Sequence, residues 1–168
     1  MDQSLQNVFD FHTAFGIPTP AEPGFPEMSL ADRALVASYA LEMADLARRL
    51  KAAAQVANLN RRGGLGTMLI RLQLIQEEGG ELAEAIAKDD LVEACDALAD
   101  LDYVVNGGWL VLGMAAIKAA ACQAVHDSNM SKLDENGKPI LSEAGRVIKG
   151  PNYQPPTEAL RRLLENGL

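Results

Sequence analysis

The sequence is poor in cysteine and in basic residues, and both shortages exclude classes of protein. Its two cysteines, Cys95 and Cys122, show no CxxC spacing, so we expect neither a disulfide framework nor a cysteine zinc site. We interpret both as buried, reduced thiols. The net charge is −8. A protein that binds polymeric nucleic acid through the phosphate backbone needs a basic stripe, so we expect no such partner.

Long apolar runs are also missing. The most apolar stretch, residues 104–125, is interrupted by Asn106, two glycines and Lys118, whereas a membrane span requires about 20 nearly uninterrupted apolar residues. The first residues contain neither a basic segment nor an apolar segment of the kind found in secretory signals. We therefore expect a cytoplasmic protein that does not contact the membrane.

Apolar residues recur at helical spacing through most of the chain, which predicts an all-α fold. Ser29 and Asp32 predict the cap of a long helix that ends near Asn58. Four prolines between residues 18 and 26 predict an extended connector before it. The predicted single domain comprises an N-terminal helix and connector (1–28), a helical core (29–131), and a hairpin-like loop with a C-terminal helix (132–168).

Three shorter features complete this prediction. Residues 3–15 are predicted to form an amphipathic helix, whose buried side would carry Leu5, Val8, Phe9, Phe11 and Phe15. Asn136-Gly137 is a strong tight-turn signal and predicts a β-hairpin-like excursion in an otherwise irregular segment. The final helix is predicted over residues 158–165, with Thr157 as its cap and Gly167 as its stop.

Acidic side chains are concentrated in two predicted helices between residues 71 and 103, joined by a polar turn at residues 88–90. In an antiparallel pair, residues that lie opposite each other have a nearly constant sum of residue numbers. Apolar stripes near helical spacing run along both helices and consist of Leu72, Leu74, Ile75, Leu82, Ile86, Leu91, Val92, Leu98 and Leu101. The acids are predicted to meet in three rungs, formed by Glu78 with Asp100, Glu81 with Asp96, and Glu84 with Glu93.

No lysine or arginine lies between Arg71 and Lys88, so ion pairs four residues apart do not explain the acids of the first helix. Carboxylates packed this closely repel each other and raise each other's pKa, and a divalent cation removes that penalty. Carboxylate oxygens are ligands that suit Mg²⁺ or Mn²⁺. The pattern therefore predicts a metal site rather than two solvated acidic faces.

The run Glu77-Glu78-x-x-Glu81, followed by an acidic helix that contains Asp100-Leu101-Asp102-Tyr103, resembles the MazG-like all-α nucleoside triphosphate pyrophosphohydrolases. That superfamily includes the phosphoribosyl-ATP pyrophosphohydrolases and the dimeric dUTPases. The resemblance implies a MazG-like helical bundle and Mg²⁺-dependent cleavage of a nucleoside triphosphate to the monophosphate and pyrophosphate. It also implies a homo-oligomer, a dimer or tetramer, in which each site borrows residues from a neighbouring copy.

The family's E-x-x-D element fits the second helix in two registers. Glu93-Ala94-Cys95-Asp96 matches it literally, whereas residues 97–103 align better with the family's E-L-A-D-L-L-Y and place Ala97 where glutamate is usual. The pairing of the helices favours four metal ligands, which are Glu78, Glu81, Asp96 and Asp100. Glu93 is the alternative ligand. Glu77 or Glu84 is expected to orient the attacking water.

Further elements resemble parts of the family that contact the substrate. Residues 126–132 resemble H-x-x-N-x-S-K, residues 149–156 resemble K-G-P-N-Y-x-P-P, and residues 11–16 resemble a Phe-His-x-x-Phe-Gly segment. The substrate-binding residues implied are His12, Asn129, Lys132, Lys149 and Tyr153. Asn106 and Trp109 lie beyond Asp102, where a base would stack on the indole and bond to the amide; Trp109 as a core anchor is the alternative.

The predicted function is metal-dependent nucleoside triphosphate pyrophosphohydrolysis, with control of one nucleotide pool, such as dGTP or dUTP, as a specific form. Two alternatives stay open, namely a phosphoribosyl-ATP pyrophosphohydrolase and a non-catalytic helical oligomerisation module. The helical stretch 33–62 departs from the family, in which the first helix leads more directly into the E-E-x-x-E helix. It is expected to change the oligomer contact or one wall of the pocket.

Overall fold

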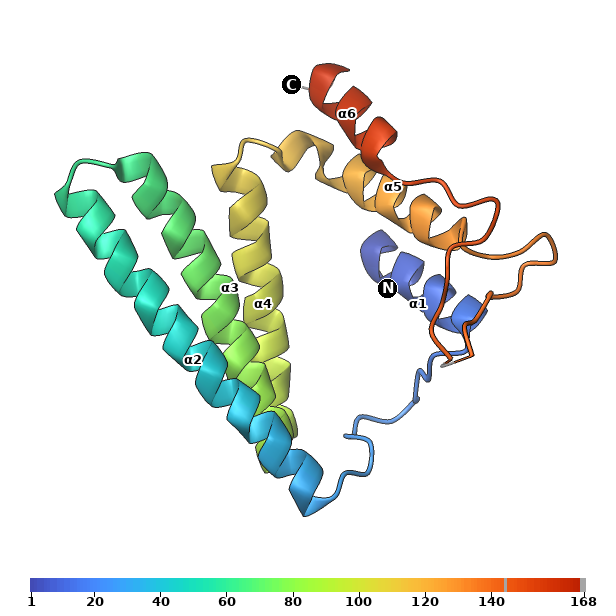
Figure 1. Cartoon of the computed structure of the whole chain (residues 1–168), viewed down its shortest axis with the longest axis horizontal. Helices are drawn as coiled ribbons and strands as arrows, with labels where there is room; N and C mark the ends of the chain where they lie inside the picture. The colour runs from blue at the N-terminus through green and yellow to red at the C-terminus, as the bar shows by residue number, and fades with distance from the viewer. Residues whose placement is uncertain (144, 167–168) are drawn as a thin grey trace. The chain divides into compact units, whose positions relative to one another are not determined.

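The computed structural model describes residues 1–143 and 145–166, and it confirms the all-α prediction. Figure 1 shows the α-helices of the described residues, coloured along the chain. They are α1 (Gln3–Phe15), α2 (Leu30–Leu59), α3 (Gly63–Lys88), α4 (Leu91–Val111), α5 (Lys118–Met130) and α6 (Thr157–Asn166), with a short 3-10 helix at Ala115–Ile117. None of the described helices is by itself long and apolar enough to cross a membrane.

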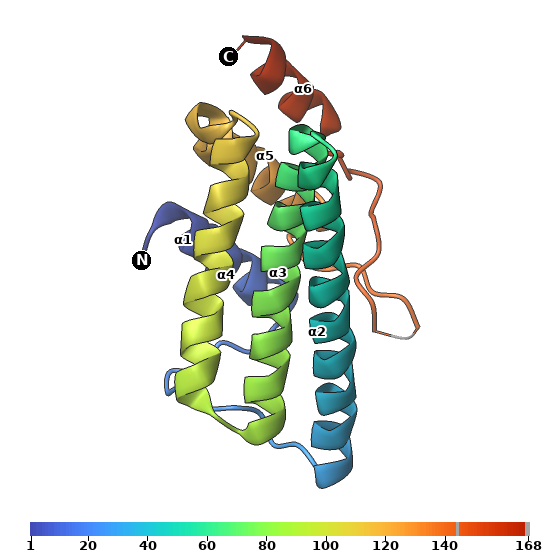
Figure 2. The ribbon, with the colours of Figure 1, turned by 90° about the vertical axis from the view of Figure 1, so that its left-hand side faces the viewer.

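The chain forms two compact units. One unit, Glu22–Val111, contains α2, α3 and α4, which lie side by side in Figure 2. The other unit combines Met1–Ala21 with Leu112–Leu168 and contains α1, α5 and α6. The unit boundaries differ from the predicted subdivision at residues 28 and 131, because α1 and α5 pack together although they lie far apart in the sequence.

Small residues form the seam between α2 and α3. Three buried positions on each helix recur every seven residues, a spacing that returns to nearly the same helix face; they are Ala40, Ala47 and Ala54 on α2 and Gly66, Gln73 and Gly80 on α3, and Ala57 and Ala85 are buried as well. A Cβ atom on Gly80 would lie 3.4 Å from the Cβ atom of Met43 and 3.6 Å from the backbone nitrogen of Ala44. The two backbones therefore approach closely because little side-chain volume separates them.

Local hydrogen bonds fix the ends of these helices. Ser29 Oγ accepts a bond of 3.1 Å from the backbone nitrogen of Asp32, and the Asp32 carboxylate accepts one of 3.0 Å from the backbone nitrogen of Ser29. This reciprocal capping box confirms the predicted start of α2. At the α3–α4 turn, Asp89 adopts a left-handed conformation, and the Asp90 carboxylate accepts bonds from the backbone nitrogens of Val92 and Glu93.

The second half of α4 contains residues of low helix propensity and is nevertheless helical. Asn106, Gly107 and Gly108 do not interrupt the helix, which continues to Val111 and is followed by Gly113 at a φ of 71°. Gly107 and Gly108 do not have a positive φ. A need for the left-handed backbone conformation therefore does not account for glycine at these positions.

The unit that contains α1 is held partly by polar contacts. Asn7 is buried, and its Nδ2 atom donates a 3.0 Å hydrogen bond to Oε1 of Gln123 on α5. The predicted buried side of α1 is wrong in part, since Leu5, Val8 and Phe9 are exposed. The rings of Phe11 and Phe15 stack with their centroids 4.1 Å apart.

The segment between α5 and α6 forms two short excursions, each closed by an isolated antiparallel bridge, at Leu133–Pro139 and Leu141–Val147. Gly137 has a φ of 71°, as the tight-turn signal predicts. No extended strand occurs in residues 1–143 or 145–166, which agrees with an irregular, hairpin-like appendage. Thr157 begins α6 as a helical residue, and the predicted stop at Gly167 lies outside the described residues.

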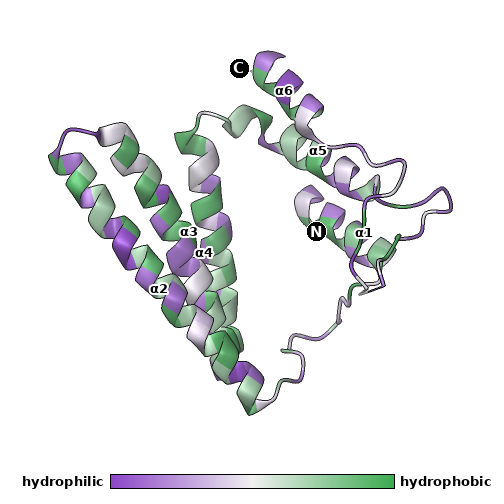
Figure 3. Cartoon of the chain, in the orientation of Figure 1, coloured by the Kyte–Doolittle hydropathy of each residue, from purple (hydrophilic) through white to green (hydrophobic). Residues whose placement is uncertain are grey.

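Large apolar side chains are mostly absent from the buried set, which consists largely of alanines. Hydrophobic and hydrophilic residues alternate along the visible faces of α2, α3 and α4 (Figure 3). Five members of the apolar stripes on α3 and α4 are exposed, namely Leu72, Ile75, Leu91, Val92 and Leu98. The prediction of a buried thiol is wrong for Cys95, which is exposed, while Cys122 is half-buried.

Candidate active site

The acidic side chains of α3 and α4 lie within electrostatic range of one another. Burial raises the pKa of Glu78, and neighbouring negative charges raise it further; these belong to Glu81, Asp100, Glu77 and Asp96. Burial also raises the pKa of Glu81, with further increases from Glu77, Asp100, Asp96 and Glu93. Since both helices contribute to each shift, the predicted antiparallel pairing brings their carboxylates together.

Glu78 contributes a fully enclosed oxygen to the acidic cluster, by which we mean Glu77, Glu78, Glu81, Glu93, Asp96 and Asp100. Its Oε2 atom is buried and makes no hydrogen bond. Glu81, Asp96 and Asp100 are exposed. Within the described residues, no three His, Cys, Asp or Glu side chains converge closely enough to hold a metal ion. The cluster is therefore an open arrangement of acids around one enclosed and unsatisfied oxygen.

The two candidates for the catalytic base have different surroundings. Glu77 is half-buried, and its Oε2 atom accepts a hydrogen bond from the side-chain amide of Gln73, which is buried in the α2–α3 seam. Glu84 is exposed and pairs with Lys88, with Nζ and Oε1 2.5 Å apart. An ion pair four residues apart thus does account for Glu84, contrary to the expectation for this helix.

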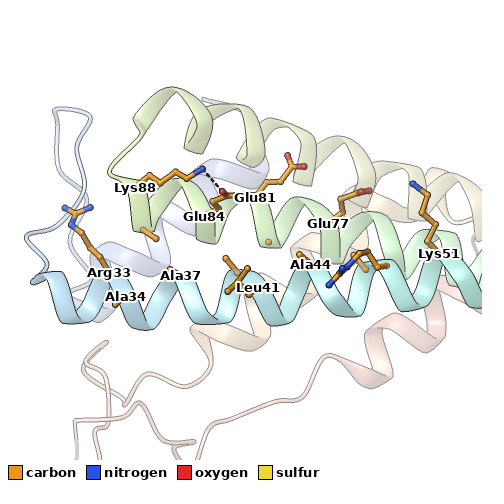
Figure 4. A pocket seen from close by; sticks show the side chains of 15 residues that line it. Arg33, Ala34, Ala37, Leu41, Ala44, Lys51, Glu77, Glu81, Glu84 and Lys88 are labelled. Carbon is orange, nitrogen blue, oxygen red and sulfur yellow. Dashed lines mark hydrogen bonds and ion pairs between the residues drawn. The ribbon is translucent and has the colours of Figure 1, made fainter.

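A groove of about 620 Å³ runs along α2 and α3. Figure 4 shows Glu77, Glu81 and Glu84 along its α3 side, Arg33 and Lys88 near one end and Lys51 near the other. Its remaining lining is largely small and apolar, with Ala34, Ala37, Ala40, Leu41, Ala44, Ala47, Gly80 and Ala87. Glu81 therefore belongs both to the acidic cluster and to the groove.

Asn106 and Trp109 lie on a different face of α4. A Cβ atom on Gly107 would meet Nη1 of Arg71, so Gly107 faces α3. Successive residues of an α-helix are rotated by about 100°, which places Trp109 on nearly the opposite side of α4. Asn106 Nδ2 donates to Asp102 Oδ2 at 3.0 Å. Contacts of Asn106 and Trp109 with a base stay a prediction.

Five predicted substrate-binding residues belong to the unit that contains α1, α5 and α6. Lys132 Nζ donates a 2.7 Å hydrogen bond to Oδ1 of Asn129, and Lys149 Nζ lies 4.4 Å from the centre of the Tyr153 ring. His12 is half-buried on α1. The lysines thus have local partners within this unit, and their role toward a substrate stays a prediction.

Two residues near the cluster were not among the sequence predictions. Gln73 lies one helical turn before Glu77, a spacing at which an amide and a carboxylate commonly interact. Arg71 lies seven residues before Glu78, on nearly the same face of α3. The spacing of four residues from Gln73 to Glu77 and of seven from Arg71 to Glu78 can be seen in the sequence. Such spacings are common on helix surfaces, so they do not identify a functional side chain.

Comparison with known proteins shows to which family the chain belongs. The chain is 31% identical over 86 residues to an uncharacterized protein of Acanthamoeba polyphaga mimivirus, a match that covers 49% of this chain and 34% of the viral protein. It therefore spans about a third of that relative's length. No solved structure matches. The phosphoribosyl-ATP pyrophosphohydrolase model matches residues 45–129, just over half of the sequence, and the chain belongs to that family.

Proposed function

We propose that the chain hydrolyses a nucleoside triphosphate to the monophosphate and pyrophosphate with the help of a divalent cation. The observation that carries this proposal is the buried Oε2 atom of Glu78, which has no hydrogen-bond partner and lies among other acids. A group of this kind is costly to bury unless a positive charge compensates it. The family match over α3 and α4 supports the same chemistry.

The donor chemistry of the cluster suits a hard divalent cation, and binding would draw together carboxylates that do not converge on one point in this structure. Every donor is a carboxylate oxygen, which suits Mg²⁺ or Mn²⁺, and mutual repulsion among the acids is the penalty that such an ion removes. The proposed ligands are Glu78, Glu81, Asp96 and Asp100, with Glu93 as the alternative. When bound, the ion supplies positive charge beside phosphate oxygens and lowers the pKa of water.

We assign the general base to Glu77 in preference to Glu84. The Gln73 amide holds the Glu77 carboxylate in place, whereas Lys88 neutralises Glu84 at the surface. Glu77 takes a proton from water as the water oxygen bonds to the α-phosphorus. The bond from that phosphorus to the α–β bridging oxygen breaks, and its electron pair leaves with pyrophosphate. Glu77 then releases the proton to solvent.

The groove along α2 is proposed to accept the nucleoside. Its small apolar floor provides a surface for a flat base, and its α3 wall brings Glu77 and Glu81 beside the substrate. Because α2 supplies the opposite wall, this interpretation gives the helical stretch 33–62 a role in substrate selection. Among nucleotides, dGTP and dUTP remain the specific candidates, and phosphoribosyl-ATP is the second candidate because the matching family is defined by that substrate.

Completion of the site by a second copy is also proposed. Leu72 and Leu98 are each 56% exposed, and Tyr103 is 78% exposed. Because contiguous exposed apolar surface marks interaction faces, we propose these residues as candidates for the contact. We further propose that phosphate or sugar of the substrate is contacted by Asn129, Lys132, Lys149, Tyr153 and His12.

Pyrophosphate release by the purified protein tests the proposed function. Each (d)NTP and phosphoribosyl-ATP is supplied with Mg²⁺, with Mn²⁺ and with a chelator, and wild type is compared with Glu81→Gln. We expect metal-dependent release with at least one substrate and its loss in the variant. Full activity in Glu81→Gln contradicts the ligand assignment. No release, together with no nucleotide-induced thermal shift, favours a non-catalytic module.

A further inference from the structure

Arg71 occupies an unusual position at the end of the acidic cluster. Its Nη1 atom lies 2.5 Å, and its Cζ atom 3.7 Å, from the point where a Cβ atom on Gly107 would stand. The guanidinium group therefore crosses from α3 and rests against the α4 backbone at Gly107. Any side chain at that position would displace it.

Helix periodicity relates this contact to the acids. Arg71 precedes Glu78 by seven residues and Gly107 follows Asp100 by seven, so both pairs lie on the facing surfaces of α3 and α4. The separation along the helix axis is about 10 Å. Between the level of Arg71 and Gly107 and the level of Glu78 and Asp100, Val104 on α4 is buried and Leu74 on α3 is half-buried. On the facing surfaces of the two helices, these apolar residues thus lie between Arg71 and the acids Glu78 and Asp100.

The charge of Arg71 is not neutralised within the part of the chain that the structure describes, since no carboxylate there lies within ion-pair distance of it. In the same unit Arg33 pairs with Asp89 and Arg48 with Asp45, each at 3.1 Å, whereas Arg61 and Arg62 are exposed to water and make no ion pair with a described residue. Arg71 is nevertheless half-buried. A permanently charged group that is partly removed from water favours an anionic partner.

We propose that Arg71 binds the diphosphate portion of the substrate, which becomes the leaving pyrophosphate. This assignment rests on the proposed function, because it takes the α-phosphate to lie at the acidic cluster. The acids repel the remaining phosphates, whereas the guanidinium group beyond Leu74 and Val104 offers a planar fork of donors that matches phosphate oxygens. Gly107 lowers helix stability relative to alanine but leaves the room that this geometry requires.

Two glycines provide a matched test. Gly107→Ala keeps the arginine but places a methyl group where its guanidinium lies, while an added Cβ at Gly108 meets nothing within 4 Å. Both substitutions raise helix propensity equally. Binding of inorganic pyrophosphate in the presence of Mg²⁺ is measured by calorimetry for wild type, Arg71→Gln, Arg71→Lys, Gly107→Ala and Gly108→Ala, with a nucleoside monophosphate as the second probe.

We expect Arg71→Gln and Gly107→Ala to weaken pyrophosphate binding by about tenfold or more, the effect of losing hydrogen bonds to a charged group. Gly108→Ala should stay within about twofold of wild type, Arg71→Lys should lie between, and monophosphate binding should not change in any variant. Thermal melting of each variant confirms that it is folded.

Wild-type affinity in Arg71→Gln, equal losses in the two glycine variants, or no pyrophosphate binding by wild type would each overturn the inference. Its failure is distinguishable from that of the proposed function. Triphosphate hydrolysis that Glu81→Gln abolishes, combined with pyrophosphate binding that Arg71→Gln leaves unchanged, retains the function and rejects the inference. Arg71-dependent pyrophosphate binding without hydrolysis of any substrate supports the anion site and rejects the function.

Discussion

Glu77 accepts a hydrogen bond from the buried amide of Gln73, one turn earlier on α3. The bond fixes one carboxylate beside the acidic cluster, at the edge of a groove that also contains Glu81. Glu84 lies two turns further along and is engaged by Lys88 instead. Two glutamates that are equivalent in the sequence pattern therefore differ in how they are held.

Replacement of Gln73 by methionine should lower kcat while the fold is retained. Methionine has nearly the same volume but cannot donate to Glu77, so the base loses its orientation. Residues that orient a catalytic group typically contribute about 10–100-fold, and we expect a decrease in that range in the pyrophosphate-release assay. Glu84→Gln is the matched surface control and should stay within about threefold of wild type. A larger loss in Glu84→Gln than in Glu77→Gln would reverse the assignment of the base.

Removal of one charge from the cluster should stabilise the protein when no divalent cation is present. The pKa of Glu78 is raised above its usual value of 4.5 by burial and by neighbouring acids. The folded state therefore binds more protons than the unfolded state, and stability falls as pH rises from the unfolded pKa through the folded pKa. In EDTA at pH 7, Glu78→Gln should melt about 2 °C or more above wild type.

The same measurement across pH provides the internal control. Below pH 4.5 Glu78 is largely protonated in both states, and the advantage of Glu78→Gln over wild type should disappear. An advantage that is constant from pH 4 to pH 8 would show that it arises from packing and not from charge.

Divalent cations should have the opposite effect on stability. An ion that binds the folded state alone raises the free energy of unfolding, by about 2.7 kcal/mol at a free concentration 100 times its Kd. We expect Mg²⁺ or Mn²⁺ to raise the melting temperature of wild type and to leave Glu78→Gln almost unchanged. Sodium chloride at the same ionic strength separates specific binding from screening. An equal rise with sodium chloride would indicate screening only.

Much of the fold was predictable because its signals are local. The capping box at Ser29 and Asp32 and the turn residue Asp90 act through hydrogen bonds within four residues. The short turn at residues 88–90 also fixes the pairing of α3 with α4, because it leaves little freedom of register. The acids could therefore be placed near one another from the sequence.

The rest could not be predicted because it depends on which helix face meets which neighbour. Periodicity identifies the apolar face that contains Leu98, but it does not reveal that Ala94 and Ala97 are the buried residues of α4. The role of Gln73 depends on the α2–α3 seam in the same way. The pairing of Lys88 with Glu84 was missed because the turn residue was counted outside the helix.

The capping box should affect stability and not activity. Ser29→Ala removes the side-chain oxygen that accepts from the backbone nitrogen of Asp32, and the loss of such a cap costs about 1 kcal/mol. Because Ser29 does not line the groove along α2 and α3, the specific activity of the folded protein should be unchanged. Urea denaturation gives the free energy of unfolding, and the assay at saturating substrate gives the activity. A fall in kcat without a fall in stability would contradict this separation.

The exposed apolar residues of α4 should control oligomeric state. Leu98 is 56% exposed on a helix whose buried residues are Ala94, Ala97 and Val104. A charge at that position would be buried unpaired in an apolar subunit interface, at a cost of several kcal/mol, but would be solvated in a monomer. We therefore expect Leu98→Glu to shift sedimentation velocity from an oligomer to a monomer without loss of helicity. Glu93→Gln changes charge on an exposed position of the same helix and should leave the oligomer intact. A wild-type monomer at micromolar concentration, or an unchanged oligomer in Leu98→Glu, would show that this face is not the contact.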